Sequence, residues 1–274
     1  MTDPSRTGSN SAGPLSSPQE RDVAPAGGGF AVVEMFTSQG CNSCPPAEEL
    51  LTEIEREARK EGQPVYALGF HVDYWDDLGW PDPFADAAYT ARQRAYAHAF
   101  GSGGLYTPQM IVNGTVEFVG SDRRRAATAI AAALTEAATT PLALSVEDTA
   151  AGDGHRVVVD YQTERPPPRA VLNVVVVERG LENHVPRGEN AGRTLRQDNV
   201  VRAFTSVGLD APSGRVELAM PPDLDPEHAS VVGYVQHHGN KAIVGARAVE
   251  LAIEQGAQSG RRSSPDARRP NLGA

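Results

Sequence analysis

The chain contains only two cysteines, and they lie three positions apart as the C-x-x-C pair Cys41 and Cys44. A strand-like run at 30–36 precedes them, and a helix-like run at 47–60 follows two prolines. The pair therefore lies at a strand-to-helix junction, where unpaired backbone N–H groups and the helix dipole favour a thiolate. Any intramolecular disulfide must join these two residues. A four-cysteine zinc site is excluded because the second pair is absent.

The first half of the chain alternates between strand and helix patterns. Residues 30–36 predict a buried strand, and apolar side chains in 46–61 recur with the helical period up to Gly62. Residues 64–71 predict a second strand. Because a helix joins them, the two strands should be parallel, with a right-handed crossover.

An insertion at 73–104 follows, with an aromatic loop and a helix predicted at 83–100. Residues 109–119 then predict a hairpin, since Asn-Gly at 113–114 is the preferred tight-turn pair. Asp122 is a candidate cap for a last helix that runs to about residue 138. The order β-α-β, insert, β-β-α is the thioredoxin layout. There a cis-proline loop faces the cysteines, and Thr107-Pro108 stands at that position, so we expect a cis bond.

The second half consists of short strand-like runs separated by Gly, Pro and Asp. They lie at 142–146, 155–162, 170–178, 200–206, 215–219, 230–237 and 243–251. Several alternate apolar and polar residues, as half-buried antiparallel strands do. We therefore predict an α/β protein with a thioredoxin-like domain at 30–140 and a β-sandwich-like, all-β domain at 141–253. The Ser-, Pro- and Gly-rich stretch 1–29 and residues 254–274 are predicted to be disordered tails.

Charge and hydropathy exclude several classes of partner. The formal net charge of −10 argues against a general affinity for nucleic acid or an anionic membrane. No segment reaches the roughly 18 consecutive apolar residues of a membrane span. The N-terminal stretch lacks a basic start followed by an apolar run, so we expect a cytoplasmic protein.

The cysteine pair predicts thiol–disulfide exchange. We assign Cys41 as the exposed nucleophile and Cys44 as the resolving thiol, with exchange passing through a mixed disulfide on Cys41. Pro108 would shape the substrate groove. Pro45 disfavours helical geometry at Cys44, so the helix should begin at Pro45 or Pro46. The cysteines would then receive less support from the dipole than a fully helical pair.

Residues at the carboxyl end of the second predicted strand are candidate modulators of the thiols. His71 and Asp73 could tune a thiolate or move protons, and Trp75 and Thr107 join them as modulating candidates. His71 and Asp73 could also join the cysteines as metal ligands. The alternative is a histidine satisfied by its neighbours and a loop packed by its aromatic side chains.

Other polar residues have simpler interpretations. Glu34 and Glu117 interrupt apolar strands, and we interpret both as facing solvent and not as proton relays beneath the cysteines. The charged stretch 188–193 could reach over the thiols as a specificity loop, but we favour a surface turn. The pair at 237–238, His-His, is not expected to bind metal.

Four ordered sequence blocks resemble a bacterial thioredoxin-like family catalogued as a domain of unknown function, many of whose members are described as secreted. The blocks are FTSQGCNSCPPA at 36–47, HVDYWD at 71–76, YTPQ at 106–109, and the stretch from GEN at 188–190 to NVV at 199–201. The resemblance implies a thioredoxin-like fold with Cys41 and Cys44 at its site. It also makes a periplasmic or secreted location the alternative to the cytoplasm.

The resulting functional prediction is a thiol–disulfide oxidoreductase-like protein that acts on protein or small-molecule thiols and disulfides. One alternative is a metal-binding or metallochaperone module, in which Cys41, Cys44 and His71 hold Cu(I) or Zn(II). Another is a non-catalytic interaction protein on a thioredoxin scaffold. No organic cofactor is expected, since the sequence has no glycine-rich phosphate loop after a strand and no dinucleotide fingerprint.

Overall fold

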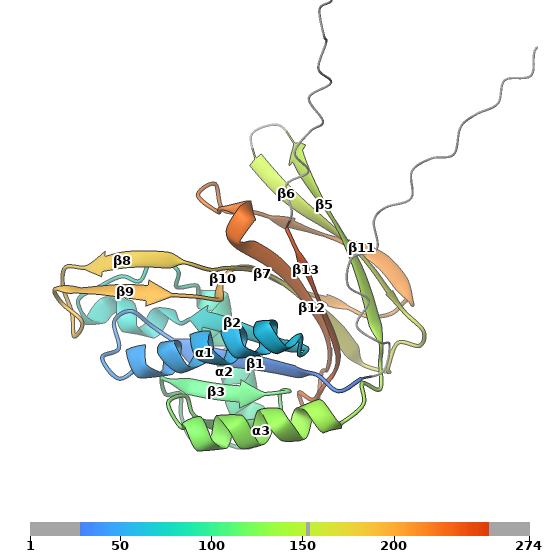
Figure 1. The fold of residues 1–274 in the computed structure, drawn as a ribbon, viewed down its shortest axis with the longest axis horizontal. Helices are drawn as coiled ribbons and strands as arrows, with labels where there is room; N and C mark the ends of the chain where they lie inside the picture. Colours follow the sequence, from blue (N-terminus) through green and yellow to red (C-terminus); the bar gives the residue numbers. More distant parts are fainter. Residues whose placement is uncertain (1–27, 152–153, 252–274) are drawn as a thin grey trace, which may run out of the picture.

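The structure is a computed structural model that describes residues 28–151 and 154–251, with side chains left out at 148–155. Both predicted tails lie outside these residues, apart from 28–29 at the end of the first. The described chain is a mixed α/β protein with an eight-stranded mixed sheet, a three-stranded sheet and a two-stranded sheet (Figure 1). The α/β class predicted from the sequence is confirmed.

The N-terminal half follows the predicted order of elements. Its elements are β1 (Ala31–Thr37), α1 (Pro45–Glu61), β2 (Val65–His71), the 3-10 helix η1 (Asp73–Leu78), α2 (Ala87–Phe100), β3 (Gln109–Val112), β4 (Val116–Val119) and α3 (Arg123–Thr135). Strands β1 and β2 are parallel, and β3 pairs antiparallel with both β1 and β4. Asn113 and Gly114 both have positive φ, as the Asn-Gly turn predicts.

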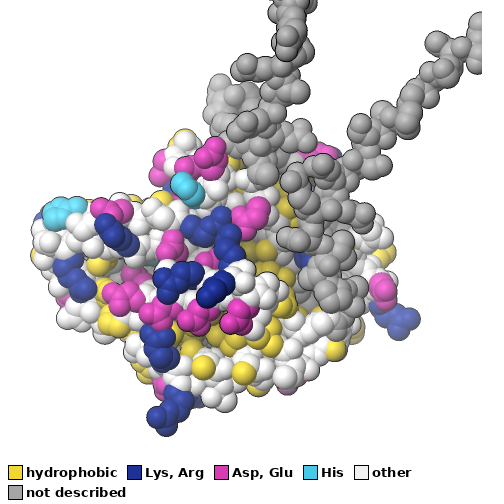
Figure 2. Space-filling view, viewed as in Figure 1, with side chains coloured by type: hydrophobic (Ala, Val, Ile, Leu, Met, Phe, Trp, Pro, Cys, Tyr) yellow, Lys and Arg dark blue, Asp and Glu magenta, His cyan; other side chains and the backbone are white. Residues whose placement is uncertain are grey.

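Local chemistry explains where the helices begin and end. In α1, the positions Ala47, Leu50, Leu51 and Ala58 are buried, while the charged side chains other than that of Glu48 form a band on the surface (Figure 2). Gly62 ends α1 in the left-handed conformation, with φ of 65°. Asp122 caps α3, since its carboxylate accepts from the Arg125 N–H, which confirms the predicted cap.

The C-terminal half is built of strands. They are β5 (Leu142–Ala151), β6 (Gly154–Thr163), β7 (Ala170–Glu178), β8 (Leu181–Val185), β9 (Arg193–Gln197), β10 (Val200–Gly208), β11 (Ser213–Ala219), β12 (Ala229–His237) and β13 (Ile243–Glu250), with the 3-10 helix η2 (Pro226–His228) before β12. The sequence predicted seven of these nine strands. The hairpin of β8 and β9 was missed, because half of its side chains are exposed and they form no apolar run.

One large sheet joins the two halves of the chain. Its strand order is β13-β12-β7-β10-β2-β1-β3-β4, and β10 meets β2 in parallel through the pair Val200 and Gly69. Four strands from the predicted all-β region thus extend the sheet of the N-terminal half. An alanine Cβ at Gly69 would lie 3.2 Å from the carbonyl oxygen of Asn199, so the missing side chain allows this close approach.

Three packed layers of apolar side chains position the elements. Helices α1 and α3 cover one face of the large sheet with the core around Val33, Met35 and Leu51. Helix α2 covers the other face, around Phe36, Phe70 and Tyr96. The three-stranded sheet β11-β6-β5 packs against β7 and β12. Within the described residues, no helix has the length and apolarity needed to cross a membrane.

Glu34 does not face solvent, so that prediction was wrong. The residue lies in β1, which is covered on both faces, and its side chain is fully buried. Its carboxylate is paired with Arg92 of α2 and accepts hydrogen bonds from the hydroxyls of Tyr96 and Tyr234. These partners are distant in sequence, so the pattern around Glu34 could not reveal them. Glu117 is only half-buried and binds Gln109 from the edge strand β4.

Candidate functional site

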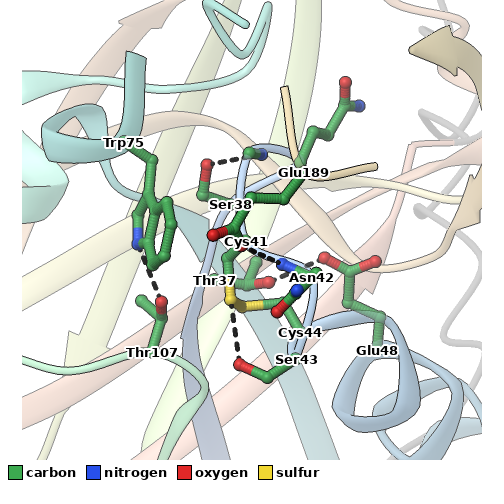
Figure 3. Close-up of a disulfide and its surroundings, with 12 residues drawn as sticks. Thr37, Ser38, Cys41, Asn42, Ser43, Cys44, Glu48, Trp75, Thr107 and Glu189 are labelled. Atoms are coloured by element: carbon green, nitrogen blue, oxygen red, sulfur yellow. Dashed lines mark hydrogen bonds between the residues drawn. A yellow bond between two sulfur atoms is a disulfide. The ribbon is translucent and has the colours of Figure 1, made fainter. Parts of the chain in front are cut away.

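Cys41 and Cys44 form a disulfide at the point where β1 leads into α1, with Cα atoms 5.5 Å apart (Figure 3). Helix α1 begins at Pro45, as predicted. Cys44 nevertheless has helical geometry, with φ of −78° and ψ of −39°, which contradicts the expected effect of Pro45. The carbonyl of Cys44 accepts from the N–H groups of Ala47 and Glu48, and these first helical bonds stabilise the conformation that proline disfavours.

The first turn of α1 offers the sulfurs few backbone donors. Pro45 and Pro46 have no N–H, and the next two N–H groups donate to the carbonyl of Cys44 at 2.8 and 3.1 Å. A thiolate here would be favoured by the helix dipole but not by a free N–H of the first turn. The two prolines thus remove backbone donors from the first turn, whereas the weaker dipole support that we predicted assumed a non-helical Cys44, which the structure does not show.

Cys41 is buried, so the prediction that its sulfur is exposed was wrong. Both cysteines are fully buried, while Asn42 and Ser43 between them are exposed. The hydroxyl of Ser43 lies 3.3 Å from Sγ of Cys41. Sγ of Cys41 is therefore in contact with a surface side chain.

A loop from the C-terminal half covers the disulfide. Residues 186–192, which we call the cap, connect β8 to β9. The buried amide of Asn190 donates to the carbonyls of Gln39 and Cys41 at 2.9 and 3.0 Å. The carboxylate of Glu189 accepts from the N–H of Asn42 at 3.0 Å. Residues 188–193 are therefore a surface turn, as predicted, with all but Asn190 exposed, and these contacts also hold the turn against the thiol site.

Trp75 and the Thr107–Pro108 loop lie beside the disulfide on the side away from Glu48 (Figure 3). The Thr107–Pro108 bond is cis, as predicted. The indole N–H of Trp75 donates to the hydroxyl of Thr107 at 2.9 Å. A Cβ added at Gly40 would lie 3.1 Å from Cβ of Trp75, so the glycine before Cys41 lets the tryptophan approach.

Pro108 packs close to the start of α1. A Cβ added at Gly120 would meet Cβ of Pro108 at 3.0 Å and Cβ of Ala47 at 3.1 Å. Gly120 therefore lies between the cis-proline and the first turn of the helix, and its N–H donates to the carbonyl of Pro108 at 2.8 Å. The structure brings the predicted residues Cys41, Cys44, Thr107 and Pro108, together with Trp75, into one place.

His71 is buried and bound to a residue that sequence reasoning missed. Its Nδ1 lies 2.7 Å from the carboxylate of Asp82, which also accepts from the N–H of Gln39 at 2.7 Å. Burial lowers the pKa of His71, but the charge and hydrogen bond of Asp82 outweigh it, and the pKa is raised overall. Burial likewise opposes ionisation of Asp82, but His71 and the backbone donors lower its pKa overall. The two form a buried ion pair that braces the segment before Cys41.

Asp73 does not join the thiol site. The carboxylate of Asp73 accepts a hydrogen bond from the hydroxyl of Thr90 at 2.5 Å. The backbone N–H of Asp73 donates to the hydroxyl oxygen of Thr90 at 3.1 Å. It therefore fastens η1 to α2 and is not brought to the cysteines.

Glu48 is a second site residue that sequence reasoning missed. It lies in the first turn of α1, its side chain is buried, and its carboxylate accepts from the hydroxyl of Thr37 at 2.7 Å. Burial raises the pKa of Glu48, against the opposing effects of His71 and Thr37. The spacing could have revealed it, because positions 44 and 48 lie on the same face of a helix.

The residues proposed as metal ligands are bound to other groups in the structure. Cys41 and Cys44 are joined to each other, and Nδ1 of His71 is bound to Asp82. Throughout 28–151 and 154–251, no group of three or more His, Cys, Asp or Glu side chains is arranged to hold a metal ion. The residues at 237 and 238 do not form such a group either.

Comparison with known proteins identifies the family. The sequence matches the profile of a family described as "Protein of unknown function (DUF1223)" over residues 32–236. The chain belongs to this family. No curated protein matches the chain.

The chain is also similar to a solved structure, that of protein AGR_C_4864 from Agrobacterium tumefaciens. The two are 31% identical with a TM-score of 0.59, over 82% of this chain and 96% of that one. Two further matches are a β-glucosidase from Kluyveromyces marxianus and a β-glucuronidase from Ruminococcus gnavus, with TM-scores of 0.21 and 0.23. They are 12% and 10% identical, and cover 41% and 42% of this chain but only 14% and 15% of theirs. Likenesses this weak carry no argument about fold or activity.

Proposed function

We propose that the protein is a thiol–disulfide oxidoreductase whose redox couple is Cys41 and Cys44. The observation that carries this proposal is the disulfide at the start of α1, packed beside the cis bond of Thr107 and Pro108. A purely structural disulfide would not need a tryptophan, a cis-proline loop and a cap from the other half of the chain around it.

The proposal includes a thioredoxin-like unit at 30–140. Its support is the parallel pair β1 and β2 joined by α1, the antiparallel hairpin β3 and β4, and α3 on the same face as α1. The strands from 141–253 would then be an appended all-β region, which supplies the cap over the thiols and extends the sheet through β10.

The exchange reaction follows from the position of the two sulfurs. A substrate thiolate attacks Sγ of Cys41, the bond to Cys44 breaks, and Cys44 leaves as a thiolate. A second substrate thiolate then attacks the substrate sulfur of the mixed disulfide and releases Cys41. Two substrate thiols become one disulfide, and the protein couple gains the two electrons. The reverse sequence reduces a substrate disulfide, with Cys44 resolving the mixed disulfide.

A buried acid, Glu48, lies beside the disulfide and takes part in our proposal. Glu48 lies across the disulfide from Trp75, and its raised pKa makes its carboxyl better able to hold a proton than an exposed glutamate. It could deliver that proton to the Cys44 thiolate and take it back on reoxidation. The ion pair of His71 and Asp82 would keep the segment that carries Cys41 in place.

The proposal is tested by reduction of a protein disulfide coupled to an external electron donor. Turnover that is lost in both Cys41→Ser and Cys44→Ser supports it. In Cys44→Ser, a trapped mixed disulfide on Cys41 is expected, because the resolving thiol is missing. No turnover by the unaltered chain in either direction, together with no trapped intermediate, would overturn the proposal.

A further inference from the structure

Three side chains behind the disulfide form a line of hydrogen bonds that we call the amide network, made of Trp80, Gln39 and Gln197. The indole N–H of Trp80 donates to Oε1 of Gln39 at 3.0 Å, and Nε2 of Gln39 donates to Oε1 of Gln197 at 2.7 Å. Both glutamines are buried, and Gln197 ends β9, which packs against α1. None of the three takes part in the proposed exchange of thiols itself.

The donor at the Trp80 end determines the direction of the whole amide network. An indole nitrogen can only donate a hydrogen bond, so the atom of Gln39 that faces it must be the oxygen. The other end of that amide is then its nitrogen, which needs the oxygen of Gln197 as its acceptor. The nitrogen of Gln197 is therefore the donor that remains at the far end of the network.

This remaining donor acts on Glu48. Nε2 of Gln197 is buried and completes no hydrogen bond with any described residue, although buried polar atoms normally have a partner. Burial raises the pKa of Glu48 most strongly, while donation from Thr37 and from Gln197 lowers it. Because hydrogen bonds to charged acceptors are the stronger ones, the Gln197 N–H gains most when Glu48 is ionised.

Contacts with the closed cap hold the start of the amide network in place. The backbone N–H of Gln39 donates to Asp82 at 2.7 Å, and its carbonyl accepts from Asn190 at 2.9 Å. Trp80 is half-buried against the cap, since a Cβ added at Gly188 would lie 3.3 Å from Cβ of Trp80. The indole and the first amide therefore have a fixed position behind the segment that carries the thiols.

We propose that the amide network positions an N–H against the Glu48 carboxyl and thereby makes the proton of Glu48 available to Cys44. This proposal rests on the thiol–disulfide exchange proposed above. When the disulfide opens, Cys44 leaves as a thiolate and takes the proton of Glu48, so a thiol and a carboxylate form and the total charge is unchanged. Burial alone would keep that proton on Glu48, whereas donors that face the carboxylate favour its release.

Other charged groups also act on Glu48, and the variants used in the test leave them in place. His71 of β2 lowers the pKa of Glu48, and Asp82 raises it. The two charged residues of β9, Arg193 and Arg196, are exposed. Because none of these groups is altered, a changed pKa of Glu48 reports on the amide network.

The two tryptophans of the chain provide a matched pair of variants. In the full chain labelled with ¹³C at the glutamate carboxyl carbons, the Glu48 resonance is the one lost in Glu48→Gln, and its titration measures the acid directly. Trp80→Phe removes the donor that orients the network, so we expect Glu48 to become about a fivefold weaker acid. Trp75→Phe should leave the titration unchanged, because that indole donates to Thr107 on the other side of the disulfide.

Gln197→Leu removes the last donor itself and should make Glu48 about a tenfold weaker acid. Circular dichroism and the melting temperature show which variants are folded. The ratio of variant to unaltered turnover should also change with pH across the titration of Glu48. An unchanged titration of Glu48 in a folded Trp80→Phe or Gln197→Leu chain, or an equal change in Trp75→Phe, overturns the proposal. The titrations need no turnover, so they separate a failure of the amide network from a failure of the proposed exchange.

Discussion

The cap over the disulfide should control how fast the disulfide reacts, and Asn190 is the residue that tests this. Its amide donates to the carbonyls of Gln39 and Cys41, and its Oδ1 accepts from Arg193 at 2.8 Å. In Asn190→Ala, the carbonyl of Cys41 keeps the N–H of Cys44 as a partner, but that of Gln39 loses its donor. One buried acceptor without a partner costs roughly 1–3 kcal/mol.

We therefore expect the closed cap to lose about 2 kcal/mol relative to the open state, which raises the open population by about 30-fold. If the disulfide reacts only when the cap is open, its reduction by dithiothreitol should accelerate by the same factor. The assay is the rate of thiol alkylation after timed exposure to dithiothreitol, read by intact mass. The matched control is Glu182→Ala, which breaks an exposed ion pair with Arg196 in the same hairpin. Equal rates for Asn190→Ala and the unaltered chain, or equal acceleration by the control, would refute the gating role of the cap.

Two further predictions concern the buried ionisable groups. Asp82→Asn leaves the buried charge of His71 without its counter-charge and should lower the free energy of unfolding by about 3–5 kcal/mol. The pair raises the pKa of His71 and lowers that of Asp82. The loss of stability should therefore be full between about pH 4 and 6.5, and it should fade as pH rises through the raised pKa of His71. Urea unfolding at pH 5.5 and pH 9 measures this difference, and a loss of stability that is the same at both pH values contradicts it. Glu48→Gln removes an acid whose pKa is raised by burial, so it should gain stability relative to the unaltered chain as pH rises above about 4.3. Urea unfolding at pH 4 and pH 7 measures that gain, and an equal difference at both pH values contradicts the assigned pKa direction.

Local patterns in the sequence predicted most elements because each depends on neighbours along the chain. The apolar period of α1, the cap at Asp122 and the Asn-Gly turn are all signals within a few residues. The position of Thr107 beside the disulfide, and of Pro108 near the first turn of α1, followed from the order of elements and the site expected before the hairpin.

What could not be predicted depends on contacts between distant parts of the chain. Glu34 is buried because Arg92 and Tyr234 reach it from other elements, and nothing near residue 34 reveals those partners. The burial of Cys41 has the same origin, since Asn190 lies 149 positions away. Glu48 is different, because its helical spacing from Cys44 was present in the sequence and could have been used.

The central claim is that Cys41 and Cys44 form an exchangeable redox couple and not an inert structural bond. The most direct test is to equilibrate the full chain in mixtures of reduced and oxidised glutathione and to count the free thiols by alkylation and mass spectrometry. We predict a single two-electron transition with a reduction potential above about −300 mV, within reach of cellular thiol pools. A disulfide that stays oxidised throughout this range, and is reduced only when the chain is unfolded, would contradict the claim.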